Sequence, residues 1–256
     1  MTFTIENFDV FLLILVRITG FIYTAPFFSL SNVPFRVKTG FSIFLTAIIF
    51  YTVSYTTPEY DNVIQFAVLI VSEALAGAIM GFFANIAYRI IAFAGQFIDM
   101  EIGFSMVSQF DPTTSIQTTI TANFYGYAIL LMMMITNLHH HFLKAVIDSF
   151  QVAGVGEVRI DPASYQLMAR FITDYFIIGF RIVLPVFASI LIVNTILAIL
   201  AKIAPQMNMF VIGMQIKIFV GLFVMLLVVE MIPSVADFIF KEMFSLMKAS
   251  LEYLRE

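Results

Sequence analysis

Cysteine is absent from the 256-residue sequence, and charged residues are scarce, at 12% of the chain. Without cysteine the chain can form no disulfide framework, thiolate metal site or cysteine nucleophile. The net charge of −4 is spread thinly, so the sequence has no basic patch and predicts no nucleic-acid partner. The strings H-E-x-x-H, G-x-S-x-G and G-x-G-x-x-G and the P-loop are also missing. We therefore expect a non-catalytic protein with no cofactor and no metal site.

What the chain has in quantity is apolar side chains. They make up 61% of it and its mean hydropathy is +0.98, whereas a soluble domain is about half apolar and about a quarter charged. Long apolar runs cover residues 8–30, 39–55, 63–84, 86–104, 124–147, 168–200 and 210–232. Since a spanning helix needs about 20 residues, these runs predict an all-α, membrane-associated bundle of long apolar helices with roughly six or seven passes. Pro185 lies inside a run and predicts a kink or break there, so some helices should be partly broken.

Ionisable residues lie well inside nearly all of these apolar runs. Even on a lenient insertion scale, a central Arg, Lys or Asp in lipid costs about 2.5–3.5 kcal/mol, so these side chains must face protein or water. The candidates for buried charges and assembly contacts are Arg17, Glu73, Arg89, Asp99, Arg181 and Lys217, with Arg170, Asp174 and Glu230 as further intramembrane charges. Spacing alone leaves open which of them form ion pairs.

Small residues recur beside Glu73, at Ala74, Gly77, Ala78 and Gly81. A GxxxG-type face lets two helix backbones approach closely, so Gly77 and Gly81 predict a close-packing surface. Two interpretations are open. The face is used either for tight packing within one chain or for contact with neighbouring subunits.

Three consecutive histidines, His139 to His141, suggest a metal site. Consecutive helical residues point about 100° apart, however, whereas a chelating pair on a helix needs i,i+3 or i,i+4 spacing. We therefore interpret the histidines as a helix end packed against partners.

The intramembrane charges also allow a function of another class. Substrate and ion sites of secondary transporters use such charges together with broken helices. A small-solute or ion transporter with Arg17, Glu73, Asp99 and Arg181 as its polar pathway is therefore the alternative. Against it, the sequence shows no pair of corresponding broken helices in two related halves.

One long stretch, residues 103–124, interrupts the apolar runs with Ser, Thr and Gln dotted with Met and Phe. It contains no Lys or Arg, and Asp111 is its only charged residue. On these residues alone an ordinary surface loop is the default interpretation.

Five blocks taken together resemble the FliR/SctT family of type III export-gate proteins. They are VRITGFIYTAPFFSLSNVPFRVKTGFS (16–42), ANIAYRIIAFAGQFIDMEIGFSM (84–106), FDPTTSIQT (110–118), NLHHHFLKAVIDSF (137–150) and KIAPQMNMFVIGMQIKIFVGL (202–222). The blocks keep the family's order and extend over nearly the whole chain. The strings APQMNMFVIG and DSFQVAGVG resemble the flagellar branch more than the virulence branch.

The resemblance implies a hetero-oligomeric helical export gate for unfolded flagellar proteins at the basal body, in the bacterial inner membrane. One such chain would join several FliP-like and FliQ-like chains, with FlhB-like and FlhA-like components and membrane lipid nearby. It also implies one domain over 1–256, in which residues 1–200 are FliP-like and residues 201–256 form a FliQ-like C-terminal helical hairpin. Much of the subunit would be held above the plane of the membrane, so its helices need not span as a conventional bundle.

The resemblance also implies that residues of about 105–122 form a plug loop in the central pore. The composition suits that role, because adaptable Met, bulky Phe and neutral hydrogen-bonding groups can seal a pore without a fixed charge that traps substrates. The plug-loop residues are Met106, Val107, Ser108, Gln109, Phe110, Asp111, Pro112, Thr113, Thr114, Ser115, Gln117, Thr118 and Thr119. Of these, Asp111 and Pro112 are expected to fix the local backbone.

Overall fold

The computed structural model describes residues 5–53, 55, 57, 58, 60–104, 119–159 and 164–254. Over these residues the chain forms helices and no β-strand, which confirms the predicted all-α fold. The helices are α1 (Ile5–Thr24), α2 (Phe35–Thr52), α3 (Val63–Ile102), α5 (Ile120–Ile135), α6 (Leu138–Val152), α7 (Ser164–Ile203), α8 (Met209–Val228), the short 3₁₀ helix η1 (Val229–Met231) and α9 (Ile232–Glu252).

The chain folds into two compact units built from interleaved segments. Unit 1 contains Met1–Tyr88, Met134–Phe171 and Ile239–Glu256, and unit 2 contains Arg89–Met133 and Ile172–Phe238. The long helices α3, α7 and α9 each contribute to both units. The division into a FliP-like part and a FliQ-like part stays a prediction, which these units do not address.

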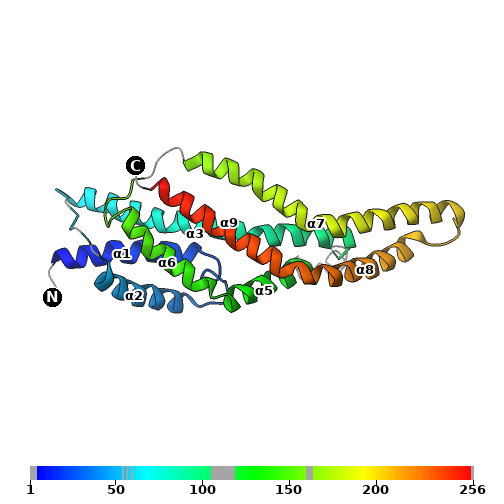
Figure 1. Cartoon of the computed structure of the whole chain (residues 1–256), viewed down its shortest axis with the longest axis horizontal. Helices are drawn as coiled ribbons and strands as arrows, with labels where there is room; N and C mark the ends of the chain where they lie inside the picture. The colour runs from blue at the N-terminus through cyan, green and yellow to red at the C-terminus, as the bar shows by residue number, and fades with distance from the viewer. Residues whose placement is uncertain are drawn as a thin grey trace. The chain divides into compact units, whose positions relative to one another are not determined.

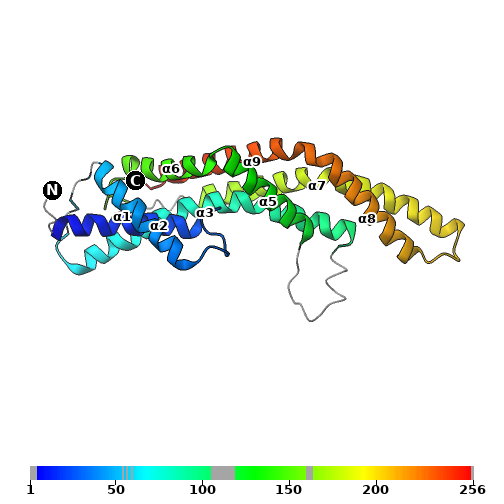
Figure 2. The same ribbon diagram turned by 90° about the horizontal axis from the view of Figure 1, so that it is seen from below.

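In unit 1, α1 lies beside α2 and the first half of α3 (Figure 1, Figure 2). Leu13, Ile14 and Phe21 of α1 are fully buried, because their spacing places them on faces covered by neighbouring helices. The end of α9 packs against α6, where the rings of Phe142 and Phe244 stack with centroids 5.3 Å apart.

In unit 2, α7 and α8 form a helical hairpin. Figures 1 and 2 show the two helices side by side, and α7 turns its buried stripe, Val186, Ile190, Val193 and Leu197, inward. The side chain of Asn208 accepts hydrogen bonds from the backbone N–H groups of residues 210 and 211, at 3.2 and 3.4 Å, and so caps the start of α8. Residues 204–208 form the turn that joins α7 to α8. After α8 the chain continues through η1 into α9.

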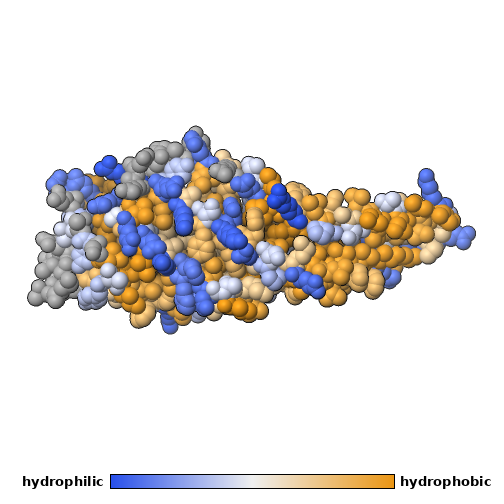
Figure 3. Space-filling view, in the orientation of Figure 1, coloured by the Kyte–Doolittle hydropathy of each residue, from blue (hydrophilic) through white to orange (hydrophobic). Residues whose placement is uncertain are grey.

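Three helical stretches are long and apolar enough to cross a membrane, namely Val63–Ile102, Gln166–Ile203 and Met209–Glu252. A fourth arises if α5 and α6, which bend by 71° at their junction, count as one span. Apolar side chains cover most of the visible surface along the hairpin of α7 and α8, with hydrophilic groups at its tip (Figure 3). The chain is therefore a membrane protein.

The expectation of six or seven passes is wrong. Asn85 separates the apolar runs 63–84 and 86–104 in the sequence, but it lies within the single 40-residue helix α3. Its side-chain amide donates to the Thr24 carbonyl at 2.7 Å and to the Ser29 hydroxyl at 3.2 Å, so it is satisfied without ending the helix. Pro185 likewise lies inside α7 and does not break it.

Candidate functional site: polar clusters among apolar helices

Helices α1 and α3 cross in unit 1 through glycines. A carbon atom added at Gly81 would lie 2.8 Å from the backbone nitrogen of Ala25, and one added at Gly77 would lie 2.8 Å from the carbonyl carbon of Arg17. Only glycine permits such an approach of two backbones. The structure therefore places both predicted glycines in a contact within the chain, and no neighbouring subunit is needed to explain them.

This crossing brings together two of the predicted charges. The Nε–H of Arg17 donates to Oε2 of Glu73, and Nη2 donates to Oε1 at 2.9 Å. The two side chains are only 1% and 0% exposed. The guanidinium also lies over the ring of Phe150, with Cζ 4.2 Å from the centroid. A fork of two parallel hydrogen bonds is the strongest form of this ion pair, and it neutralises two charges that could not be buried singly.

The same ion pair holds the segment that follows α6. Arg17 donates to the carbonyl oxygens of Ala153, at 3.0 Å, and Gly154, at 3.2 Å. In return the N–H of Gly156 donates to Oε1 of Glu73 at 2.8 Å. Gly156 has φ +81°, a conformation that disfavours any other residue. Arg17 and Glu73 therefore connect α1, α3 and this segment through one buried cluster.

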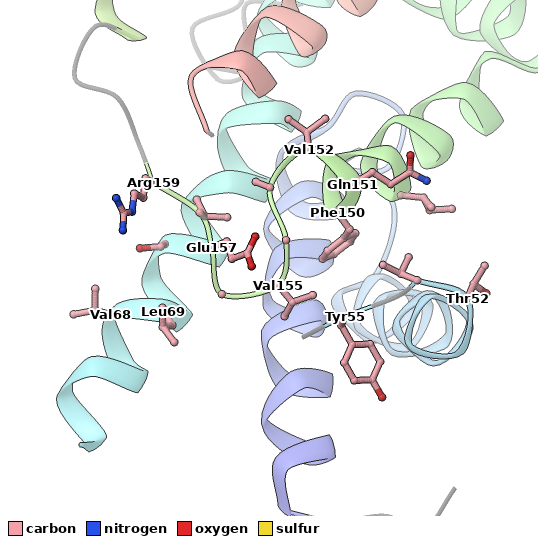
Figure 4. Close-up of a pocket in the computed structure, with 17 residues that line it drawn as sticks. Thr52, Tyr55, Val68, Leu69, Phe150, Gln151, Val152, Val155, Glu157 and Arg159 are labelled. Carbon is pink, nitrogen blue, oxygen red and sulfur yellow. The ribbon is translucent and has the colours of Figure 1, made fainter. Parts of the chain in front are cut away.

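A cavity of about 1140 Å³ opens beside the segment. Its lining comes from the end of α2, the start of α3, the end of α6 and residues 153–159. In Figure 4, Glu157 points into the loop that residues 153–159 form, whereas Arg159 points away from it. Val68 and Leu69 form the wall from α3. Among the residues that line this cavity, none is a nucleophile hydrogen-bonded to a base, which covalent catalysis would need.

A second polar cluster lies in unit 2, where α3 meets the start of α5. Asp99 is 3% exposed, and its two carboxylate oxygens accept from the N–H of Thr121 at 3.1 and 3.2 Å. The Thr121 hydroxyl donates to the same carboxylate. The first N–H groups of a helix have no partner inside it, and a negative charge is favoured there. Asp99 therefore caps α5 from another helix.

The Asp99–Thr121 contact joins the two sides of the predicted plug loop. On one side α3 ends at Ile102, followed by Gly103 with φ +98°. On the other, the half-buried Thr119 accepts a hydrogen bond from the N–H of Asn123 at 3.1 Å, immediately before α5. Thr119 is the one predicted plug residue among those that the structure describes. Outside the described residues lie Met106, Val107, Ser108, Gln109, Phe110, Asp111, Pro112, Thr113, Thr114, Ser115, Gln117 and Thr118.

The remaining candidate charges lie at the surface of unit 2. Arg89 is exposed and has contacts within the chain, and its carbonyl accepts from the Tyr175 hydroxyl at 3.2 Å. Arg181 is exposed and Lys217 half-buried, and neither forms an ion pair with any residue that the structure describes. The structure thus brings Arg17 and Glu73 together and places the other four candidates elsewhere.

Several partners in these clusters were not found from the sequence. They are Thr121, Phe150, Gly156 and Ser149, whose hydroxyl lies 3.4 Å from Nη1 of Arg17. The string VAGVG signals a turn after α6, but nothing in it shows that this turn meets an arginine about 136 positions earlier.

In the part of the chain that the structure describes, no three His, Cys, Asp or Glu side chains are grouped as metal ligands would be. His139 instead lies among rings, with centroids 5.8 Å from Phe27 and 4.1 Å from His140.

Comparison with known proteins matches residues 8–243 to the family described as bacterial export proteins, family 1. The chain is 35% identical over 231 residues to the flagellar biosynthetic protein FliR of Bacillus subtilis, covering 89% of this chain and 88% of that protein. It is 29% identical over 240 residues to the FliR protein of Pectobacterium carotovorum, covering 93% and 91%. With the FliR protein of Escherichia coli it shares 27% over 236 residues, covering 91% and 89%.

Proposed function

Because this chain belongs to family 1 of the bacterial export proteins, the FliR/SctT family, we propose that it is a non-catalytic subunit of the flagellar protein export gate. The observation that carries the proposal is similarity along nearly the full length to proteins named for flagellar biosynthesis. The three long apolar helical stretches agree with a place in the membrane. We place the subunit in the bacterial inner membrane at the flagellar basal body.

The proposed partners are FliP-like and FliQ-like subunits, FlhB-like and FlhA-like export components, and the unfolded flagellar proteins that pass through. Support comes from the surface of unit 2, where large apolar side chains such as Phe210, Phe219 and Leu226 are more than half exposed. Exposed apolar surface on this scale needs lipid or protein to cover it.

Within this gate, residues of about 105–122 act as the plug loop. The support is that α3 and α5, the helices on either side, are held together by Asp99 and Thr121. A loop with anchored ends can open or close a pore while the helices on either side stay in place.

The transporter alternative has less support. Its pathway of Arg17, Glu73, Asp99 and Arg181 requires Arg17, Glu73 and Asp99 to be available to a solute or ion. All three are buried, and each is engaged by hydrogen bonds within the chain. A substrate could use them only by breaking the clusters that connect the helices.

Deletion of the gene in a flagellated host, with complementation by the intact chain, tests the proposed function. We expect the deletion to abolish secretion of flagellar filament protein and motility, and the intact chain to restore both. Normal secretion without the chain would refute an export role.

Shortening the segment between Val107 and Thr119 tests the plug. We predict that the shortened chain still co-purifies with FliP-like and FliQ-like subunits but makes the membrane leaky to ions, because the pore loses its seal. Ion conductance of the reconstituted complex is the measurement. Conductance equal to that of the unmodified complex would argue against a pore-closing loop.

A further inference from the structure

An apolar groove runs between α7 and the junction of α8 with α9 in unit 2. Its volume is about 250 Å³. The α7 wall consists of residues at positions i, i+3, i+4 and i+7, which form one helix face. The facing wall is apolar except for Ser234. The lining residues are Ile178, Arg181, Ile182 and Pro185 on one side and Val228, Met231, Ser234, Val235 and Phe238 on the other.

Arg181 is the ionisable residue of this groove. It lies in the middle of the α7 wall, with Ile178 one turn before it and Pro185 one turn beyond. Its guanidinium makes no hydrogen bond or ion pair with the rest of the described chain. Its own backbone carbonyl also lacks the usual helical donor, because Pro185 has no N–H. Polar groups without partners thus interrupt an otherwise apolar wall.

A third polar group without a partner lies in a neighbouring cavity. A small cavity lined by Tyr125 shares Ile182, Val228 and Val235 with the groove. Tyr125 is 5% exposed, and its hydroxyl has no hydrogen-bond partner within the described residues. Buried tyrosine hydroxyls are ordinarily paired. The groove therefore adjoins a buried polar atom that no described residue satisfies.

We propose that this groove receives an apolar helix of a partner subunit whose Asp or Glu side chain pairs with Arg181. A groove between two helix faces suits a third helix. Guanidinium selects carboxylate through paired hydrogen bonds, and in an apolar setting an unpaired charge needs such a partner. A lipid headgroup fits less well, since Arg181 lies in the middle of the α7 wall and not at its end.

This inference deepens the proposed function, because it defines the chemistry of one assembly contact. The test uses the full chain in cells that make the complete export apparatus, with the photoreactive residue p-benzoylphenylalanine in place of Phe238 on the groove wall. The matched control carries it in place of Phe219, which is 74% exposed on α8 but does not line the groove. We expect the Phe238 position to cross-link to a membrane helix bearing Asp or Glu, identified by mass spectrometry, and the Phe219 position not to reach that helix.

Charge reversal then tests the ion pair. Arg181→Glu should lower the cross-link yield at least tenfold, whereas Arg181→Lys should retain most of it. Replacing the partner's acid with Arg should restore the cross-link yield of the Arg181→Glu variant. Should Arg181→Glu fail to accumulate, neutralising the partner's acid beside unaltered Arg181 tests the same bond. A phospholipid adduct, a cross-link between two copies of this chain, or a partner helix without a required acid would each overturn the proposal. None of these would affect the export role, which the gene deletion decides independently.

Discussion

At the scale of single residues, Arg17 and Glu73 are stable in the interior only as a pair. Both side chains are almost fully buried, and their hydrogen-bonding groups are directed at each other and at the backbone of residues 153–156. Removing one partner would leave the other charge without compensation in an apolar environment. Removing both would replace the charges with packing and need not be costly.

Arg17→Gln and Glu73→Gln are therefore each expected to lower the free energy of unfolding by about 3–5 kcal/mol. The double variant Arg17→Met with Glu73→Leu should be more stable than either single variant, because it buries no charge. Since the chain has no tryptophan, thermal unfolding in detergent is best followed by far-UV circular dichroism. Single variants as stable as the unmodified chain would show that the ion pair does not support the fold.

At the scale of elements, the crossing of α1 and α3 depends on direct contact between backbones. We predict that Gly81→Ala lowers the free energy of unfolding by about 1–3 kcal/mol, because the added methyl group overlaps α1 and forces the helices apart. Gly40 is the matched control. It lies in the exposed part of α2 with nothing within 4 Å of an added carbon, so Gly40→Ala should stabilise by about 0.5–1 kcal/mol. Equal melting temperatures for the two variants would contradict the close crossing.

The elements also show what sequence patterns can and cannot predict. Apolar run length predicted the helical membrane fold, and the GxxxG spacing identified Gly77 and Gly81, because both signals are local. The predicted number of passes was wrong, because Asn85 lies inside one helix. Its side-chain amide donates a hydrogen bond to the end of α1, about 61 positions away, which the sequence pattern does not show. The same limit applies to the clusters. Asp99 was identifiable as a charge that lipid would not tolerate, but its bond to Thr121 follows only from how α3 and α5 pack.

At the scale of the whole molecule, the candidate charges separate into two groups. Arg17, Glu73 and Asp99 are satisfied inside the chain. Arg89 and Arg181 are exposed, and Lys217 is half-buried. Arg181 and Lys217 form no ion pair with any residue that the structure describes. A membrane subunit that works alone would have to leave these two to lipid or solvent, whereas a subunit of a larger gate can pair them with neighbouring chains. The arrangement therefore favours a protein whose surface is completed by assembly.

The last prediction concerns this assembly. Arg89→Leu should reduce recovery of FliP-like and FliQ-like subunits in co-purification, because a cation at the surface of unit 2 is lost. Asp99→Leu should reduce it too, by uncapping α5 and altering the surface that α5 presents. Arg36→Leu, an exposed change on α2 outside the predicted contacts, should leave recovery unchanged. Circular dichroism separates the mechanisms, since Asp99→Leu should also lower the melting temperature, whereas Arg89→Leu should act on the complex more than on the chain. Full recovery of the complex with both variants would show that these charges are not assembly contacts.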